Sequence, residues 1–507
     1  MDARAVVVVG AGPTGLMLAG DLARAGVAVT VLDRLPEPSR EPKANGVIGQ
    51  VVRLLHHRGV LARLGHVAGP PVTPAFQFGG VGLDLTAAPG HPLHGLGASQ
   101  QDLERALGDR ARELGVEVRR PCEVVGLTTV EDSVTVRVRH GPDVHDLAAP
   151  YVVGCDGAHS RVRELAGIGF PGVTDSTVVS RSADVTVPGG VVDPATARLE
   201  VPGLPALGLY RWNRTPRGAW AMLPQPSGAL RVSAMEWDGD DPSATDPEEA
   251  PISVPEVAAA LARVVGETIP MTAPPGPGPH QLRRWRGRNT RIAQTYRHGR
   301  VLLAGDAAHV HNAVGAPGLN VALQDAACLA WRLAGAVRGA PALLEGYEPE
   351  RRPAAERVAM HTQAQTLLLA PGESVTALRA LLTELATEPP VTARLAALLE
   401  GSDLRYPAAP DAHPLTGRFL PDLDGVDDLD GLVDEPWPVL LDLGAAPRDV
   451  PAGVGVAALE VDDPPAGALL VRPDGYVAWA SDDGGPAAAT ALRRAVAALT
   501  GDTASPS

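Results

Sequence analysis

The chain opens with apolar runs whose spacing changes from strand-like to helical and back. AVVVVG (5–10) predicts a buried strand, LMLAGDLARAG (16–26) predicts a helix, and VAVTVLD (27–33) predicts a second strand. Elements in this order form a βαβ unit, so we expect a parallel sheet. The rest of the block predicts a helix over 51–63, a Gly- and Pro-rich loop to 97, a helix over 100–115, and strands at 116–120, 122–132, 133–140 and 151–157.

The pattern changes between residues 170 and 285. SADVTV (182–187), GAWAMLP (218–224) and LRVSAMEW (230–237) alternate as the strands of an antiparallel sheet do. The acidic stretch 238–251 and the proline-rich stretch 271–279 predict loops, and a helix is expected between them at 256–266. The nucleotide-domain pattern resumes at Arg300, and helices extend to about Glu400.

The tail has a third character. A link punctuated by proline (413–425) leads to strands at 437–444, 455–461 and 468–481 and to a closing helix at 491–501. We therefore predict an α/β protein with an inserted domain. Its parts are a Rossmann-like domain (1–170), an antiparallel-sheet substrate domain (171–285), the second part of the Rossmann-like domain with its helices (286–400), and a small C-terminal domain (401–507).

Composition narrows the classes of function. The net charge of −15 and the absence of clustered basic residues argue against nucleic acid as a partner, and Lys43 is the only lysine. Cys122, Cys155 and Cys328 lie far apart, so we expect no metal site and no disulfide framework, and a cytoplasmic location. No signal-peptide pattern and no apolar run of about 18 residues is present, so no membrane association is expected.

GAGPTG, from Gly10 to Gly15, follows the first strand directly and opens the first helix. In such a motif Gly10 permits a tight turn, Gly12 lets a pyrophosphate approach the backbone, and Gly15 lets helix and strand pack closely. Pro13 and Thr14 complete the turn, and Asp33 ends the next strand, where a carboxylate can bind ribose hydroxyls. This arrangement predicts a dinucleotide site.

Two further Asp–Gly pairings lie downstream. In GCDGAHSRVR, Asp156 either caps a helix or lies beside the dinucleotide, with Arg161 or Arg163 in support. In GDAAHVHNAVGAPGLN, Gly305 and Asp306 follow a strand and precede a long helix. His309 and His311 in this stretch are either packed histidines or weak candidates for a catalytic base.

The three motifs, in this order, resemble the single-component FAD-dependent aromatic hydroxylases of the para-hydroxybenzoate hydroxylase class over about residues 1–395. The tail, with LLVRPDGYVAWA, resembles the thioredoxin-like third domain of the subgroup that acts on aromatic polyketides. It contains no cysteine, so we expect a structural or oligomerisation role, and a homodimer. The resemblance implies FAD contacts for Gly10, Gly12, Pro13, Thr14, Gly15, Asp33, Arg34, Lys43, Gln100, Val124, Asp156, Gly305, Asp306, Pro317, Gly318, Leu319 and Asn320.

Two departures from the family pattern concern flavin positioning. The usual Pro-x-Gly-Gly-Gln-Gly is replaced by the sequence from Ala313 to Gly318, and the usual Arg-Thr pair by Gln50-Val51.

The implied activity is a monooxygenase reaction. NADPH or NADH, bound transiently, reduces the flavin, and a C4a-hydroperoxide formed with O2 hydroxylates a polycyclic aromatic polyketide. Baeyer–Villiger insertion remains an alternative. Arg214 and His280 are weak candidates for polarising a phenol. Predicted substrate contacts are aromatic or apolar residues of the middle sheet: Tyr210, Trp212, Trp220, Met222 and Trp237.

Three other functions stay open on the same scaffold. A flavin halogenase is disfavoured because Lys43 lies in the nucleotide region and AWAMLP lacks a full Trp-x-Trp-x-Ile-Pro motif. A flavin dehydrogenase or oxidase would bind the same cofactor without transferring oxygen. A non-catalytic, FAD-stabilised binding protein is the alternative from another class.

Overall fold

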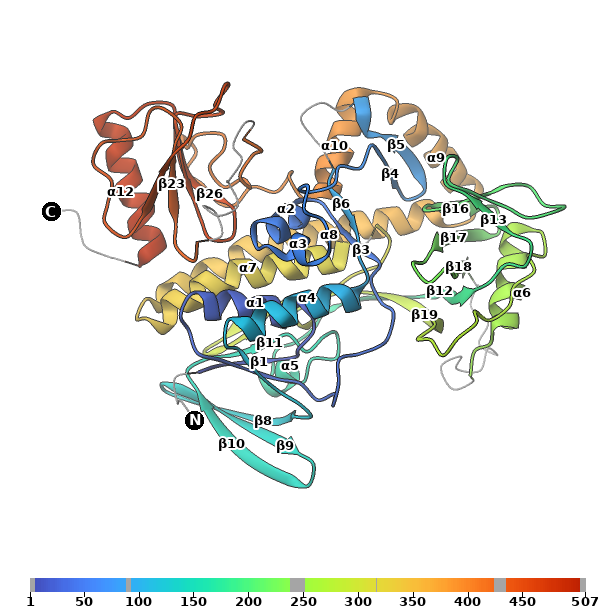
Figure 1. Cartoon of the computed structure of the whole chain (residues 1–507), viewed down its shortest axis with the longest axis horizontal. Helices are drawn as coiled ribbons and strands as arrows, with labels where there is room; N and C mark the ends of the chain where they lie inside the picture. Colours follow the sequence, from blue (N-terminus) through green and yellow to red (C-terminus); the bar gives the residue numbers. More distant parts are fainter. Residues whose placement is uncertain (1–4, 88–92, 238–250, 316, 424–434, 502–507) are drawn as a thin grey trace.

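The computed structural model describes residues 5–87, 93–237, 251–315, 317–423 and 435–501 (Figure 1). The expected βαβ unit is present as β1 (Val6–Val9), α1 (Pro13–Arg24) and β2 (Val29–Leu32). β1 lies in a six-stranded sheet of order β20-β21-β11-β1-β2-β7, parallel except for β20, which confirms the α/β class. The remaining strands are β7 (Glu117–Arg119), β11 (Val152–Gly154), β20 (Arg297–His298) and β21 (Val301–Leu303).

The strands of this sheet are apolar on both faces, so both faces must be covered. Helices cover one of them. α1 packs against α4 (Gln100–Glu113) and against the long α7 (Pro317–Val337), which in turn packs on α8 (Tyr347–Leu369). An antiparallel sheet of β8 (Glu123–Val130), β9 (Ser133–His140) and β10 (Asp143–Ala149) lies on the other side, next to α5 (Arg161–Leu165) (Figure 1).

The segment after Gly46 holds more structure than its Gly and Pro content predicts. The expected helix 51–63 is divided into α2 (Gln50–His57) and α3 (Val60–Arg63) by Gly59 in the left-handed region. The predicted loop contains a hairpin, β4 (Ala75–Phe78) and β5 (Val81–Asp84), whose turn residues Gly79 and Gly80 both have positive φ, as a tight hairpin turn requires. β3 (Gly46–Ile48) pairs with β6 (Gly95–Gly97), so a structureless loop was the wrong prediction here.

The middle domain is built on the expected antiparallel sheet, of order β16-β17-β18-β12-β19-β22. α6 (Val254–Val265) packs on one face of this sheet, against Val185, Met222 and Val232. The opposite face of the sheet, here called the inner face, carries Val178 and Met235. A small sheet of β13 (Val191–Asp193), β14 (Arg198–Glu200) and β15 (Leu207–Gly208) extends the domain, and the acidic stretch lies mostly outside the described residues. The main strands are β12 (Gly172–Val185), β16 (Trp212–Thr215), β17 (Gly218–Pro224), β18 (Leu230–Trp237), β19 (Leu282–Ile292) and β22 (His309–Val310).

The tail forms a separate hydrophobic core. β23 (Val439–Asp442), β24 (Gly455–Ala458), β25 (Ala468–Val471) and β26 (Val477–Ser481) form a mixed sheet with α12 (Pro486–Thr500) on one face. The helices before the tail also include η3 (Pro341–Gly346), which precedes α8, and α9 (Glu373–Leu385) and α10 (Pro389–Glu400), which follow it and lie beside β4 and β5 (Figure 1). The predicted α/β tail is thus present, while its thioredoxin-like assignment stays a prediction.

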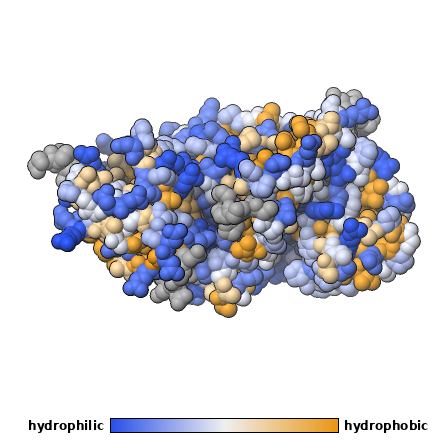
Figure 2. Space-filling model, turned by 90° about the horizontal axis from the view of Figure 1, so that it is seen from above, coloured by the Kyte–Doolittle hydropathy of each residue, from blue (hydrophilic) through white to orange (hydrophobic). Residues whose placement is uncertain are grey.

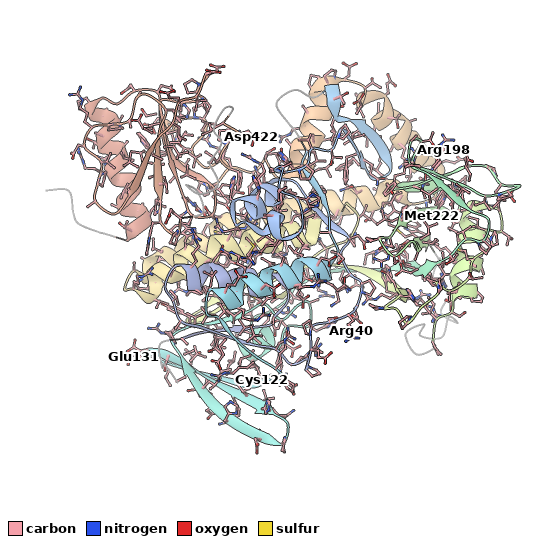
Figure 3. All side chains as sticks on the ribbon, viewed as in Figure 1. Arg40, Cys122, Glu131, Arg198, Met222 and Asp422 are labelled. Atoms are coloured by element: carbon pink, nitrogen blue, oxygen red, sulfur yellow. The ribbon has the colours of Figure 1, made fainter. Side chains whose placement is uncertain are left out.

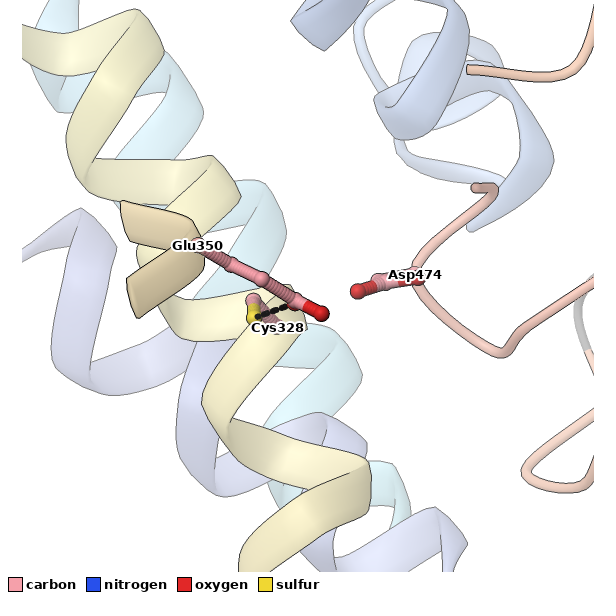
Figure 4. A group of neighbouring side chains, drawn as sticks. All are labelled: Cys328, Glu350 and Asp474. Carbon is pink, nitrogen blue, oxygen red and sulfur yellow. Dashed lines mark hydrogen bonds between the residues drawn. The ribbon is translucent and has the colours of Figure 1, made fainter. Parts of the chain in front are cut away.

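A buried polar cluster joins the tail to α7 and α8. Cys328 donates to Glu350, and Asp474 lies opposite both (Figure 4). Although these groups are close enough to hold a metal ion, both carboxylates already accept hydrogen bonds from Arg472, and Arg332 adds another to Glu350. We therefore interpret the cluster as an ion-pair network that fastens the tail to the nucleotide domain.

The surface seen in Figure 2 intersperses hydrophilic residues with smaller apolar patches. Among the described helices, none is both long and apolar enough to cross a bilayer.

Candidate active site

The glycine turn after β1 has the shape that a pyrophosphate needs. Gly10 has a φ of 104°, and a Cβ there would lie 2.4 Å from the carbonyl oxygen of Cys155. A Cβ on Gly15 would lie 2.0 Å from the oxygen of Gly10, whereas one on Gly12 would meet nothing within 4 Å. Pro13 occupies the start of α1, which has no side-chain cap and no acidic residue in its first turn. The N–H groups of this helix end are therefore available to an anion.

Asp33 lies beside this turn. Its carboxylate accepts hydrogen bonds from the backbone N–H groups of Ala11 (2.7 Å) and Leu35 (2.8 Å). Arg120, which sequence reasoning missed, pairs with Asp33 at 3.1 Å and donates to the carbonyl of Ala11. Arg34 is exposed. The tandem arginines at the end of β7 were the only signal for Arg120.

Lys43 and Gln100 approach the same region from different elements. The backbone N–H of Gln100 donates to Ala44, and its side chain bonds to Glu104. Burial raises the pKa of Glu104, and the charges of Arg120 and Lys43 oppose this rise. Val124 is a buried residue of β8, and Cys122, two residues before it, donates its N–H to the carbonyl of Asp33.

Both interpretations of Asp156 are represented in the structure. Its carboxylate accepts hydrogen bonds from Ser160 (2.5 Å) and from the N–H of Val162 (3.1 Å), so it helps to cap α5. Its Cα would also lie 3.0 Å from a Cβ on Gly10, which places it against the glycine turn. Arg163 donates to the carbonyls of Ala307 and Ala158 and so joins two of the three motifs, whereas Arg161 pairs only with Glu164 near the surface.

Asp306 carries an exposed carboxylate that forms no hydrogen bond with the described residues. Burial among surrounding protein atoms nevertheless raises its pKa, while the charges of His309 and Lys43 act in the opposite direction. The carboxylate is thus close to other protein groups yet remains available to a ligand. Gly305, with a φ of 63°, brings this loop close to the glycine turn, since a Cβ there would lie 3.0 Å from Oγ1 of Thr14.

A buried network beneath Asp306 holds the loop in place. Asp325 of α7, 0% exposed, accepts from Nε2 of His309 (2.6 Å), Nε of Arg351 (2.8 Å) and the N–H of Gly305 (3.2 Å). Arg351 also reaches the hydroxyl of Tyr406. His309 is therefore a positioning residue in the structure. Asp325 and Arg351 were not predicted; the signal was a lone carboxylate within an apolar helix.

The first turns of α7 pack against the same loop, since a Cβ on Gly305 would lie 3.1 Å from Cβ of Ala322. Pro317 begins the helix and is buried, Gly318 and Leu319 are partly exposed, and Asn320 accepts from the N–H of Ile48 at 3.2 Å. A Cβ on Gly318 would lie 3.2 Å from Cε1 of His311. Burial lowers the pKa of His311 to about 3, so this imidazole is neutral at physiological pH.

The inner face of the middle sheet meets the loop that precedes α7. Val314 packs with Val178, Ala219, Met235 and Leu369 in one buried cluster, and the partly buried Trp212 and Trp237 border it. The loop that precedes α7, from His311 to Gly315, is here called the flavin loop. These two tryptophans are therefore placed at the predicted interface between the middle sheet and the flavin loop.

The other predicted substrate contacts lie elsewhere. Trp220 and Met222 belong to the core between the sheet and α6 because strand residues alternate between faces, and Figure 3 places Met222 inside the middle domain. Tyr210 is 56% exposed. The structure does not bring these three residues to the inner face.

The two candidates for polarising a phenol have different surroundings, and the role stays a prediction for both. Arg214 donates to the carbonyls of Ala370 (2.7 Å) and Gly372 (3.0 Å), so it secures the end of α8. His280 has a buried Nε2 atom without a partner among the described residues.

These features together fit FAD. The space over Gly12 and the uncapped α1 suit a pyrophosphate, the unpartnered Asp306 carboxylate suits ribityl hydroxyls, and the start of α7 suits the electron-rich edge of a flavin ring.

Comparisons with known proteins agree. Residues 3–362 match the FAD binding domain family, and residues 413–503 match the aromatic-ring hydroxylase C-terminal family. The chain is 39% identical to 12-dehydrotetracycline 5-monooxygenase/anhydrotetracycline 6-monooxygenase of Streptomyces rimosus subsp. rimosus over 94% of each protein. It is 35% identical to dialkyldecalin synthase of Streptomyces rugosporus, over 96% of this chain and 97% of the relative.

Solved structures extend the match to the whole fold. The OxyS anhydrotetracycline hydroxylase from Streptomyces rimosus aligns with a TM-score of 0.81 and 36% identity, covering 98% of this chain and 99% of that one. The chain therefore belongs to the family of FAD-dependent monooxygenases that carry an aromatic-ring hydroxylase C-terminal domain.

Proposed function

We propose that this monooxygenase hydroxylates a polycyclic aromatic polyketide, with NAD(P)H and O2 as co-substrates. The observation that carries the proposal is the apolar contact between the flavin loop, through Val314, and the inner face of the middle sheet. A flat aromatic substrate bound along this contact, beside Trp212 and Trp237, would lie next to the start of α7. The names of the similar tetracycline-pathway enzymes support the substrate class.

The residues of the chain divide the work around the cofactor. When bound, FAD supplies the redox chemistry: it accepts a hydride from NAD(P)H and activates O2. We propose that Asp306 binds the ribityl chain, and that Gly12 and the N-terminus of α1 bind the pyrophosphate. The N–H groups of Gly318 and Leu319, at the start of α7, would stabilise negative charge that develops on the bound flavin. The apolar residues around Val314 exclude water from the reacting atoms.

Asp33, Lys43 and Gln100 complete the proposed cofactor site on the adenosine side, and Val124 offers a backbone contact. The sequence has one GxGxxG motif, so the proposal includes a nicotinamide cofactor that binds only transiently. The proposal also includes the four domain ranges and a homodimer. A cytoplasmic location is proposed as well, and the three free cysteines support it. The exposed Leu378, Leu381 and Leu385 on α9 offer an apolar surface for the dimer.

A second function is favoured by one observation. The chain also resembles a dialkyldecalin synthase, whose name denotes a synthase and not a monooxygenase. A protein that uses FAD to stabilise its fold while binding a reactive polyketide therefore remains the second candidate.

Substrate-stimulated NADPH oxidation separates the two functions. Purified protein loaded with FAD is mixed with NADPH in air, with and without polycyclic phenols such as anhydrotetracycline. Faster NADPH consumption together with a hydroxylated product supports the monooxygenase. Conversion or tight binding of the phenol without NADPH consumption favours the second candidate.

A further inference from the structure

Arg288 is a buried cation without a carboxylate partner among the described residues. It lies on β19, is 9% exposed, and its Nε atom is buried without a hydrogen-bond acceptor. One guanidinium nitrogen donates to the hydroxyl of Ser180, and the guanidinium carbon lies 5.7 Å from the centre of the Trp285 ring. Burial lowers the pKa of Arg288 to about 10, so the group remains charged at neutral pH.

Other arginines of the same sheet are neutralised. Arg231 pairs with Asp184 (2.8 Å), Arg181 pairs with Glu236 (2.7 Å), and Arg284 pairs with Glu256. Asp175 is close enough to favour the charge of Arg288, but its carboxylate is exposed and accepts hydrogen bonds from Thr177. Asp175 is also the cross-strand partner of Arg288, but no ion pair joins the two side chains. A buried cation that lacks a direct ion pair is costly for the fold, so an anionic ligand is its natural complement.

The guanidinium lies on the inner face of the sheet. Ser180, which it contacts, pairs with Met235, and the side chains of residues paired directly across two strands share a face. Met235 belongs to the buried cluster with Val314 of the flavin loop. Arg288 therefore reaches the edge of the same contact along which the aromatic substrate is proposed to bind.

The loop that precedes α7 starts from a strand paired with β19. Arg291 of β19 pairs with Val310 of β22 in antiparallel register, so the chain leaves β22 at Val310 heading in the direction of Arg288.

We infer that Arg288 binds an anionic oxygen, a phenolate or an enolate, of the aromatic substrate and so selects for acidic, hydroxylated rings. This inference rests on the proposed function, because it requires the substrate to lie against the inner face. A guanidinium presents several donors in a plane, which suits neighbouring oxygens on a fused ring system.

The test compares two probes with the same ring system, of which only one can ionise. FAD-loaded wild-type protein and Arg288→Gln are titrated with 1,8-dihydroxyanthraquinone and with its 1,8-dimethoxy analogue, which cannot ionise. Arg286→Gln is the matched control, since Arg286 lies two residues away on β19 and, among the described residues, its side chain donates a hydrogen bond only to the carbonyl of Ser176, at 3.5 Å. Dissociation constants come from calorimetry, and difference spectra report whether the bound phenol is ionised.

We expect Arg288→Gln to weaken dihydroxyanthraquinone binding by about 10- to 150-fold, the usual value of a hydrogen bond to a charged group. The phenolate band of the bound probe should disappear, the dimethoxy analogue should bind unchanged, and Arg286→Gln should match the wild type. Because the variant removes an unpaired buried charge, its flavin content and melting temperature should not fall.

Equal losses for both probes, or no loss for either, would overturn the assignment of Arg288 while leaving the proposed function intact. A wild-type holoenzyme that binds neither probe would instead overturn the proposed polycyclic substrate, and the assignment with it.

Discussion

Replacing Asp325 by asparagine tests whether the buried network under Asp306 holds the flavin loop. Asp325 and Arg351 are both 0% exposed, and the variant leaves the guanidinium without its anion. Removing one partner of a buried ion pair costs about 3–5 kcal/mol. We expect the free energy of unfolding of the apoprotein to fall by this amount, and FAD to bind more weakly because the N–H of Gly305 loses a charged acceptor.

Asp306→Asn is the matched control in the same loop. The Asp306 carboxylate has no partner among the described residues, so apoprotein stability should change by less than about 0.5 kcal/mol. Its FAD dissociation constant should nevertheless rise about 10- to 150-fold, because a hydrogen bond to a charged group is lost. Urea unfolding followed by tryptophan fluorescence and flavin-fluorescence titration measure the two quantities.

The pH dependence adds a second check on Asp325. Burial opposes its ionisation, but the charges of His309 and Arg351 outweigh burial and hold the pKa of Asp325 below its ordinary value. The stabilisation is therefore complete above the ordinary carboxyl pKa and is lost as pH falls through the lowered folded value. A loss below about 1 kcal/mol in Asp325→Asn at neutral pH, or equal destabilisation by Asp306→Asn, would refute this reasoning.

Three further changes have distinct expected outcomes. Gly10→Ala should abolish FAD retention on gel filtration, since the new methyl group would overlap the carbonyl of Cys155; normal flavin content would contradict the glycine-turn geometry. Burial raises the pKa of Glu400 to about 7, so its ionisation destabilises the fold as pH rises through that value. Glu400→Gln should therefore gain about 2–3 kcal/mol relative to wild type between pH 5 and pH 8 in urea unfolding, and a pH-independent difference would argue against it. Trp220→Ala should lose about 3–5 kcal/mol of stability, whereas Trp237→Ala should mainly raise the KM for an aromatic substrate; the reverse pattern would exchange their roles.

Local features of the chain were predictable because they depend on neighbours in sequence. The strand, glycine turn and helix around Gly10 follow from spacing alone, and so does the antiparallel character of the middle sheet. The hairpin at Gly79 and Gly80 was missed because its strands are short, although two adjacent glycines between apolar residues are a hairpin signal.

Long-range partners could not be predicted in the same way. Arg120 is distant in sequence from Asp33, and Arg351 from Asp325, so only tertiary packing brings these groups together. Alternation along β17 and β18 places Trp220 and Trp237 on opposite faces, but the sequence does not say which face α6 covers. Burial of a charge, as at Asp325 and Arg288, is likewise a property of the folded protein.

Incorporation of labelled oxygen tests the central claim most directly. The FAD-loaded protein would be incubated with NADPH and a polycyclic phenol under isotopically labelled O2, and the products analysed by mass spectrometry. The account predicts one labelled oxygen atom in each product molecule, with the carbon skeleton of the rings retained. Substrate conversion without label in the product would contradict a monooxygenase and favour a reaction in which FAD only supports the fold.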